Sequence, residues 1–261
     1  MPHLTRHLLR LLTLVLLSFV ALQCYFLVRI GLMTLLDVQS TTFQRSEVWR
    51  LIGEQRLGWA QEWRDYGRIS SSLKRAVIAS EDAGFTEHSG VEWDALEKAW
   101  ERNQKAEARA DKLNAVAEQR AQQAAARGRE PPPPKKVAAK VVGGSTISQQ
   151  LAKNLFLSGE RTALRKGQEF VLTFMLEALL SKQRILELYL NNVEWGEGVF
   201  GAQAAARRYF QIDADRLAPS QAARLAVMLP APKRFEQRPS SPYLLSRAGT
   251  VTARMGAVEL P

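Results

Sequence analysis

Three hydrophobic patterns divide this chain of 261 residues. Residues 11–28, LLTLVLLSFVALQCYFLV, contain no charged side chain, whereas residues 101–140 contain almost no large apolar one. From Val141 onward, apolar side chains recur with the period of an α-helix and few interruptions. No alternating apolar run indicates a sheet of any size. The pattern therefore predicts a mainly α domain that follows an apolar segment and carries a polar stretch.

Several segments have the period of amphipathic helices. One places its apolar and small side chains at positions 73, 76, 77 and 80, with Ser70 or Ser71 as a candidate N-cap. A second is expected to begin at Ser145 and to run to about Phe156. Further helices are predicted at 163–180, 182–191, 200–209 and 219–229, the last ended by Pro230.

The uncharged run near the N-terminus approaches the ~20 residues that span a bilayer. Gly31–Leu36 can lengthen it if Arg29 extends its charge toward the interface. Because no small-residue cleavage site follows, we interpret residues 11–36 as an uncleaved, single-pass transmembrane anchor. Arg6 and Arg10 precede it, so the positive-inside rule places residues 1–10 in the cytoplasm and the domain outside.

Aromatic residues follow the anchor among charged ones. They are Trp49, Trp59, Trp63 and Tyr66, in or just after a membrane-proximal segment at 37–62. These side chains can cap the core of the domain or can lie at the membrane interface. The sequence leaves both readings open and favours the first.

The polar stretch 101–140 carries ten Lys or Arg against five Asp or Glu, a net charge of +5 out of the chain's +10. Its first part favours a solvated helix, and Pro131–Pro134 favours an extended chain. We interpret it as an insertion in the domain. No nucleic-acid partner is expected, because the stretch lacks interleaved aromatic residues and lies outside the cytoplasm.

The residue types that are present limit the chemistry. Cys24 is the single cysteine, so no intramolecular disulfide can form. His3 and His7 precede the anchor and His88 alone follows it, which excludes a His-rich zinc site. Neither a nucleophile elbow nor a Walker sequence occurs. Carboxylates, cations and amides remain as candidate catalysts.

Two adjacent acids end one predicted helix, in the sequence ASEDAGFTEHSG of residues 79–90. An acid at a helix C-terminus faces the negative end of the helix dipole, at a cost of up to about 1 kcal/mol. Glu81 and Asp82 therefore either have a chemical purpose or lie in a solvated turn.

A second constellation is GGSTISQQLAKNLFL at 143–157. Its two glycines allow close backbone approach, and Ser145 is expected to cap the helix, so that free N–H groups gather at its start. Gln150 and Lys153 share a polar helix face with Asn154 beside it. Such faces are usually only solvated, so this signal is weak by itself.

The third constellation, RTALRKGQE at 161–169, places Arg161, Arg165 and Lys166 near the positive start of a helix. This placement is unfavourable unless an anion binds there. With Lys153, four cations lie within residues 153–166, as expected for a phosphate-bearing ligand. The alternative is a surface ion pair between Arg165 and Glu169.

Together these motifs resemble glycosyltransferase family 51, the peptidoglycan glycosyltransferases that polymerise lipid II. The matching motifs are EDxxFxxH at 81–88, GGSTISQQLAKN at 143–154, RKxxE at 165–169 and ILELYLN at 185–191. The resemblance covers about 63–245, and VEWGEGVFGAQAAARRYF at 193–210 is most similar to monofunctional members. It implies a lysozyme-like α-helical fold with a head and a membrane-facing jaw.

The resemblance also implies roles for single residues. Glu81 matches the general base, which takes the proton of the acceptor sugar's 4-hydroxyl in an inverting displacement. Glu169 matches the second essential carboxylate, which holds either nearby cations or a divalent ion such as Mg²⁺ or Mn²⁺. The resemblance does not by itself require a cofactor. Lys153, Arg161 and Lys166 match positions that bind pyrophosphate. Ser145, Gln150 and Asn154 match polar contacts of the cleft, and Asp82, Phe85 and His88 are expected to shape the motif loop.

Two features depart from the family pattern. The 101–140 insertion separates the first and second motifs by more than is usual, in the part that contacts lipid. Gln221 stands where the family has Glu, and Arg224 replaces an apolar residue, which puts the packing of that helix in question.

The resulting expectation is a catalytic domain at 63–245, which contains the insertion, and a C-terminal tail at 246–261. The domain would lie on the periplasmic side of a bacterial inner membrane. Expected partners are lipid II, the growing lipid-linked glycan, the membrane and other cell-wall synthesis proteins. The rival functions are a lysozyme-like lytic hydrolase and a non-catalytic scaffold. A hydrolase has no need of four cations beside its second carboxylate.

Overall fold

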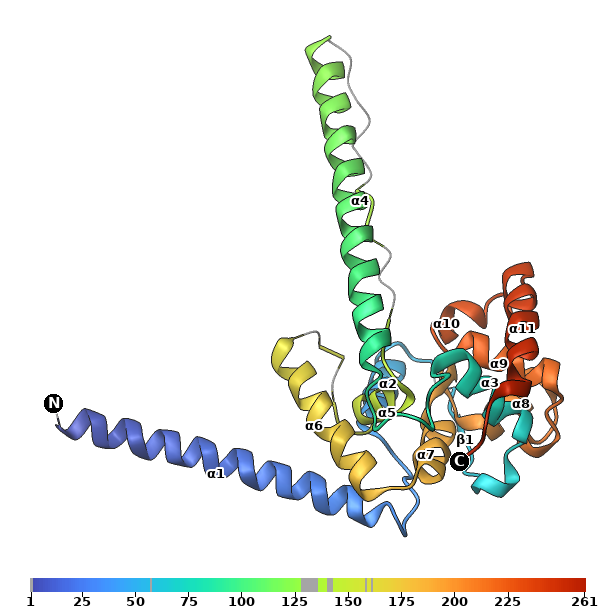
Figure 1. Ribbon diagram of the computed structural model, residues 1–261, viewed down its shortest axis with the longest axis horizontal. Coiled ribbons are helices and arrows are strands. Elements are labelled where there is room, and N and C mark those ends of the chain that lie inside the picture. The colour runs from blue at the N-terminus through green and yellow to red at the C-terminus, as the bar shows by residue number, and fades with distance from the viewer. Residues whose placement is uncertain (1, 57, 128–135, 140–142, 158, 161) are drawn as a thin grey trace. The chain divides into compact units, whose positions relative to one another are not determined.

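The computed structural model describes residues 2–56, 58–127, 136–139, 143–157, 159–160 and 162–261 (Figure 1). The chain forms two compact units, residues 1–91 with 146–261 and residues 92–145. The first unit contains the candidate catalytic carboxylates.

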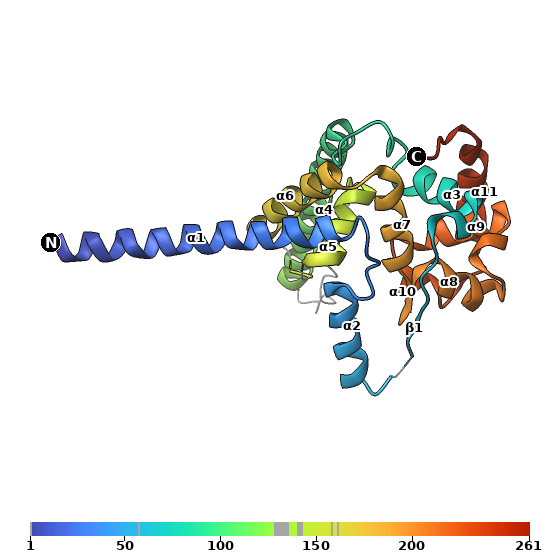
Figure 2. The same ribbon diagram turned by 90° about the horizontal axis from the view of Figure 1, so that it is seen from below.

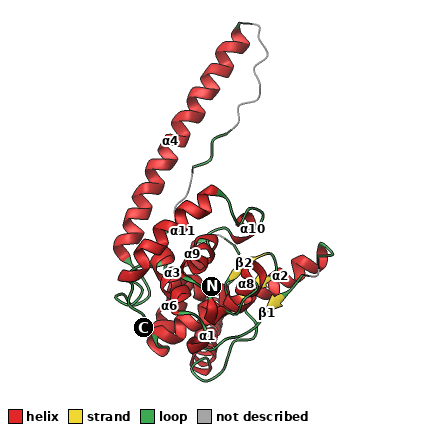
Figure 3. Ribbon diagram, turned by 90° about the vertical axis from the view of Figure 1, so that its right-hand side faces the viewer, coloured by secondary structure: helices red, strands yellow, loops and turns green. Residues whose placement is uncertain are grey.

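Helices dominate the first unit, and the strands described there are short (Figure 3). The helices are α1 (Pro2–Leu32), α2 (Thr42–Gly53), α3 (Ser71–Glu81), α5 (Ile147–Phe156), α6 (Ala163–Leu179), α7 (Lys182–Asn192), α8 (Gly201–Phe210), α9 (Pro219–Met228), α10 (Pro232–Phe235) and α11 (Pro242–Arg254). Single 3₁₀ turns are η1 (Tyr66–Arg68), η2 (Ala214–Arg216) and η3 (Met255–Ala257). The predicted mainly α fold is confirmed, and α6 to α9 agree with their predicted ranges to within one residue at each end.

The N-terminal helix α1 is long and apolar enough to cross a membrane over Thr5–Leu32, with a mean hydropathy of 2.4. It ends at Leu32, four residues before the predicted end of the anchor. Its last turns pack on the first unit: Ile30 is fully buried, and Gln23 exchanges two amide hydrogen bonds with Gln168 of α6, at 3.0 and 3.1 Å. Figure 2 shows this end of α1 beside α5 and α6.

Side-chain caps define the starts of α3 and α5. Ser70 accepts a hydrogen bond from the Leu73 N–H, which confirms one of the two predicted caps. For α5, the prediction of Ser145 as cap was wrong, because the helix begins at Ile147 and its N-cap is Thr146. Thr146 forms a reciprocal capping box with Gln149: the Gln149 N–H donates to the Thr146 hydroxyl oxygen, and the Thr146 N–H donates to the Gln149 side-chain oxygen.

The core of the first unit forms where α9 packs against α3 and α11, and where α5 packs against α6 and α7. The domain was predicted to end at residue 245, but α11 continues to Arg254 and buries Ala248 and Val251. Val258 is also buried, so the hydrophobic core extends into the predicted tail.

A three-stranded sheet joins the membrane-proximal segment to the motif region. Its order is β1 (Ala60–Gln61), β3 (Val199–Phe200) and β2 (Glu194–Gly196), with β1 parallel and β2 antiparallel to β3. Gly198 has φ +69°, and a Cβ atom there would lie 1.9 Å from the Gly58 carbonyl oxygen. Glycine at position 198 therefore allows the hairpin to approach residues 58–61.

The aromatic residues near the membrane do not share one environment. Trp63 and Tyr66 pack against the core, and the Trp59 ring lies 4.6 Å from the ring of Phe200. These contacts agree with the core-capping interpretation. Trp49 does not, since 74% of its surface is exposed.

The helix that carries Gln221 and Arg224 is well packed, which answers the question raised by these departures. Gln221 accepts a hydrogen bond from the Ala218 N–H at the start of α9, at 2.9 Å. The Arg224 guanidinium lies over the Phe210 ring and donates to the Pro239 carbonyl oxygen. Both polar side chains thus form contacts at the surface of α9, while Leu225 of the same helix is fully buried.

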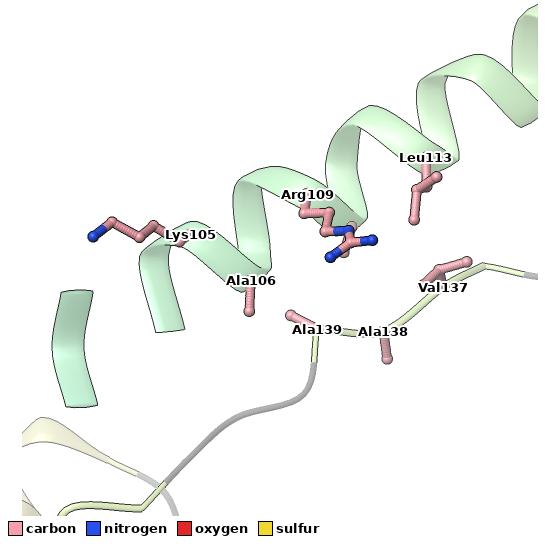
Figure 4. A pocket seen from close by; sticks show the side chains of 8 residues that line it. Lys105, Ala106, Arg109, Leu113, Val137, Ala138 and Ala139 are labelled. Atoms are coloured by element: carbon pink, nitrogen blue, oxygen red, sulfur yellow. The ribbon is translucent and has the colours of Figure 1, made fainter. Parts of the chain in front are cut away.

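The second unit contains the long helix α4 (Trp93–Ala126), most of whose side chains are exposed, as expected for a solvated helix. The chain returns along it at residues 136–139: the Asn114 side chain accepts from the Val137 N–H at 2.8 Å and donates to the Val137 carbonyl at 3.1 Å. Figure 4 shows the 540 Å³ pocket between Leu113 and Val137, with Arg109 beside them. Pro131–Pro134 lies outside the described residues.

Candidate active site

Glu81 is the last residue of α3, so its carboxylate projects from the C-terminal end of a well-capped helix. Glu81 remains partly exposed to solvent. Burial raises the pKa of Glu81 above its ordinary value, the hydrogen bond from Gln150 lowers it, and the charge of Asp82 raises it. The result is a carboxylate that binds a proton more readily than a solvated glutamate.

Gln150 of α5 and Tyr189 of α7 form a chain of hydrogen bonds that ends at this carboxylate. The Gln150 amide nitrogen donates to Glu81 Oε2 at 3.1 Å, and the Tyr189 hydroxyl donates to Gln150 Oε1 at 2.9 Å. Burial, with the negative charges of Glu81 and Asp82, raises the pKa of Tyr189 well above its ordinary value. The Tyr189 hydroxyl is therefore a neutral donor across the range in which Glu81 titrates.

Asp82 is fully buried and joins the first motif to the second. Its Oδ2 accepts from the backbone N–H of Ile147, the first residue of α5, at 2.9 Å. Its Oδ1 lies 2.8 Å from His88 Nε2, and the Gly90 N–H donates to His88 Nδ1, which leaves the imidazole proton on Nε2. These contacts agree with the expectation that Asp82 and His88 shape the motif loop.

Phe85 and Gly90 complete this loop. Phe85 is fully buried, with the Lys182 ammonium 4.5 Å from its ring centroid. Gly90 has φ +90°, and its carbonyl accepts from the Thr146 hydroxyl at 2.6 Å. The loop is thus fixed at the start of α5 by the contacts of both Asp82 and Gly90.

The polar face predicted on α5 is present. Gln150, Lys153 and Asn154 follow one another at helical spacing; Lys153 is exposed and Asn154 is half-buried. Ser145 is exposed and belongs to the second unit. Of the three predicted polar contacts, Gln150 is the one whose hydrogen bond reaches Glu81.

Glu169 lies on α6 with only 3% of its surface exposed. Arg165 donates to Glu169 Oε2 at 2.9 Å, and the Lys166 ammonium pairs with Oε1. The ion pair between Arg165 and Glu169 therefore forms, but its carboxylate is buried and is not a surface group. Arg161, the third cation of this motif, lies outside the described residues.

The surroundings of Glu169 do not fit a divalent ion. Both carboxylate oxygens already pair with cations, and the described part of the chain contains no group of three or more His, Cys, Asp or Glu that could hold a metal. Glu169 instead pairs with Arg165 and Lys166 at the start of α6, the helix that packs against α5.

Tyr189 is a site residue that the sequence pattern did not predict. Its position in ILELYLN has the helical period of a core residue, and the side chain is indeed buried. A tyrosine hydroxyl deep in a core needs a hydrogen-bond partner, which is the one signal that could have singled it out.

Comparisons with known proteins agree with the motifs. The transglycosylase family model matches residues 50–128 and 134–256. A biosynthetic peptidoglycan transglycosylase of Burkholderia pseudomallei (strain K96243) is 49% identical over 245 residues, which cover 94% of this chain and 84% of the relative. A protein of the same name from Paraburkholderia xenovorans is 44% identical over 245 residues, which cover 94% of this chain and 89% of the relative. Another from Bordetella pertussis is 54% identical over 200 residues, which cover 77% of this chain and 72% of the relative.

Proposed function

This chain belongs to the transglycosylase family and is a peptidoglycan glycosyltransferase of cell-wall synthesis, and from that premise we propose that it polymerises lipid II with Glu81 as the general base. The single observation that supports the role of Glu81 is its setting: a carboxylate of raised pKa that keeps a partly exposed edge and is oriented by Gln150.

The proposed reaction is an inverting displacement. The 4-hydroxyl oxygen of the acceptor GlcNAc attacks C1 of the donor MurNAc, and its proton passes to Glu81. The bond from C1 to the pyrophosphate oxygen breaks, and undecaprenyl pyrophosphate leaves with the bonding electron pair. The α-linked donor becomes a β-1,4-linked unit of the glycan strand. The raised pKa of Glu81 suits this proton transfer, because it makes the carboxylate a stronger base toward the attacking hydroxyl.

The cations at the start of α6 and on α5 would neutralise the charge that develops on the leaving pyrophosphate. Lys166 and Lys153 are the described residues that we assign to this role, together with Arg161. Glu169 supports it indirectly, because its two oxygens hold Lys166 and Arg165 in place. The leaving group then needs no acid to protonate it. A hydrolase that acts on finished glycan would have no pyrophosphate to bind, which favours the transferase.

The apolar helix α1 supports a membrane-anchored enzyme whose substrate is itself anchored by a lipid. We place the domain on the periplasmic side of the inner membrane, since Arg6 and Arg10 precede the span. From their match to the family motif, Ser145, Gln150 and Asn154 are assigned to polar contacts with the substrate.

The test is polymer formation from labelled lipid II by the full-length protein in detergent or vesicles. Glu81→Gln should bind lipid II but lose polymerisation by roughly 10²–10⁴, since an amide cannot accept the hydroxyl proton. Glu87→Gln is the matched control, because Glu87 is an exposed carboxylate of the same loop. Polymerisation by Glu81→Gln at the wild-type rate would remove Glu81 from the mechanism.

A further inference from the structure

Three helices each contribute one side chain to a row that ends at the proposed base. Glu81 comes from the end of α3, Gln150 from the first turns of α5 and Tyr189 from the middle of α7. The two hydrogen bonds of the row measure 3.1 Å and 2.9 Å, and the Tyr189 side chain is buried. Tyr189 does not border the exposed edge of Glu81 and is not a group that touches substrate.

The direction of both hydrogen bonds is fixed by donor and acceptor types. An ionised carboxylate can only accept, so the NH₂ end of the Gln150 amide must face Glu81. The carbonyl end then faces Tyr189, whose hydroxyl donates to it. If the amide rotated by half a turn, its oxygen would face the Glu81 carboxylate and its NH₂ would face the Tyr189 hydroxyl.

We propose that Tyr189 is a positioning residue for the glycosyl transfer: its hydroxyl locks the Gln150 amide in the orientation that donates to Glu81 and so keeps the base ionised and aimed. This inference rests on the proposed function, because it takes Glu81 as the base. Tyr189 acts through Gln150.

The physical consequence appears when the hydroxyl is removed. Without it, the Gln150 amide can rotate whenever Glu81 is protonated, since a protonated carboxyl can donate to the amide oxygen. That orientation stabilises the protonated base. In the wild type it is disfavoured, because the buried Tyr189 O–H would then face an NH₂ group and lose the Gln150 oxygen as its acceptor. The acid form of Glu81 therefore persists to higher pH in a Tyr189→Phe variant.

Other groups near Glu81 do not produce this coupling. Asp82 follows it in the chain, but both Asp82 oxygens are engaged by Ile147 and His88. Lys153 follows Gln150 by three residues on α5. Neither side chain changes when the Tyr189 hydroxyl is removed, so a shift in that variant reports on the Gln150 amide.

The experiment is the pH–rate profile of polymerisation by full-length protein with lipid II. In Tyr189→Phe, the acidic limb should move upward by about half to one pH unit, as expected for one hydrogen bond of ordinary strength. The rate should return close to the wild-type plateau at high pH, where Glu81 is ionised and only one amide orientation remains favourable. A limb at the wild-type pH, or a rate lowered by one factor at every pH, would overturn the proposal.

Tyr209→Phe is the matched control. Tyr209 also has a hydroxyl of raised pKa, but it donates to the Trp195 backbone carbonyl at 2.8 Å, away from the row. Its removal should leave the acidic limb in place, and an equal shift in both variants would contradict a specific role for Tyr189. Melting curves of both variants identify loss of folding.

A double variant separates Tyr189 from its neighbours. Gln150→Met removes both hydrogen bonds of the row and should itself move the acidic limb to higher pH, and adding Tyr189→Phe should then produce no further shift. Additive shifts would show that Tyr189 acts on Glu81 without Gln150 and would overturn the inference. Failure of the proposed function is distinguishable, because it would appear as full activity of Glu81→Gln.

Discussion

The buried carboxylate of Asp82 accepts a hydrogen bond from the backbone N–H of Ile147, at 2.9 Å. Ile147 is the first residue of α5, where N–H groups lack partners within the helix and where the dipole favours a negative charge. This one bond ties the loop after Glu81 to the helix that carries Gln150. Asp82 and Ile147 are 65 residues apart in sequence, so this bond fixes two distant motifs relative to each other.

From this contact we expect Asp82→Asn to destabilise the protein by about 2 kcal/mol, because a charge-assisted buried hydrogen bond is lost and the new amide group must be buried. The free energy of unfolding by denaturant measures this. Asp111→Asn, at an exposed position of α4, is the control and should change it little. An Asp82→Asn variant with unchanged stability and unchanged turnover would show that the bond to Ile147 does not hold the site.

Lys166→Met should lower the turnover of lipid II by about 10²–10³, as loss of one transition-state electrostatic contact typically does. Its stability should fall by only about 1 kcal/mol, since Arg165 still pairs with Glu169. Polymer formation and melting temperature are measured together. Lys105→Met, which removes an exposed i,i+4 pair with Glu101, serves as control. Near-normal turnover in Lys166→Met would exclude it from the pyrophosphate site.

Deleting residues 103–138 and closing the gap with a short Gly/Ser linker should leave a folded enzyme. The deletion removes most of α4 but retains Ala99, whose Cβ lies against Gly144 at the base of the second unit. The deleted part buries few apolar side chains, so the unfolding transition should remain cooperative. Loss of that transition in a thermal melt would show that residues 103–138 contribute to the core. If high salt weakens the activity of the full-length protein but not that of the deletion variant, residues 103–138 are attracted to anionic lipid.

Glu194 should make stability depend on pH. Its pKa is raised to about 7, mainly by burial; the charge of Lys233 opposes the rise, that of Glu47 adds to it, and that of Arg50 opposes it. Since the folded state binds this proton more tightly than the unfolded chain does, the contribution to stability is greatest below pH 4.5 and is lost as the pH rises through 7. Glu194→Gln should thus be more stable than wild type at pH 8, by up to about 2–3 kcal/mol, and gain nothing at pH 4.5. Denaturant melts at both pH values test this, and an equal difference at the two would refute it.

The amide pair between Gln23 and Gln168 predicts an unusual mutational pattern. Replacing either glutamine by leucine should weaken the docking of α1 on α6 by about 1 kcal/mol, because the remaining amide loses both hydrogen bonds. The double leucine variant should be more stable than either single one, since no unpaired amide remains. Thermal melts in detergent of the four proteins form the cycle. Additive losses would mean that the two amides do not stabilise each other.

Much of the local structure follows from the sequence. The 3.6-residue period placed α6 to α9, and Ser70 had the residue type and position of an N-cap, because helix geometry depends on neighbours three and four positions apart. The motifs also gave the residue types of the site, including Glu81, Gln150 and Glu169. Helix ends were less certain: Thr146, and not Ser145, caps α5, because its capping box with Gln149 outcompetes the neighbouring serine.

Tertiary structure alone decided how these side chains act on one another. Tyr189 has the sequence pattern of any core residue, and its partner Gln150 is 39 positions away. Glu169 could be read as a surface ion pair or a metal ligand until packing buried it between Arg165 and Lys166. The raised pKa values of Glu81 and Glu194 depend on burial by other helices and strands. Desolvation and hydrogen-bond direction are properties of groups brought together through space, and a linear pattern contains neither.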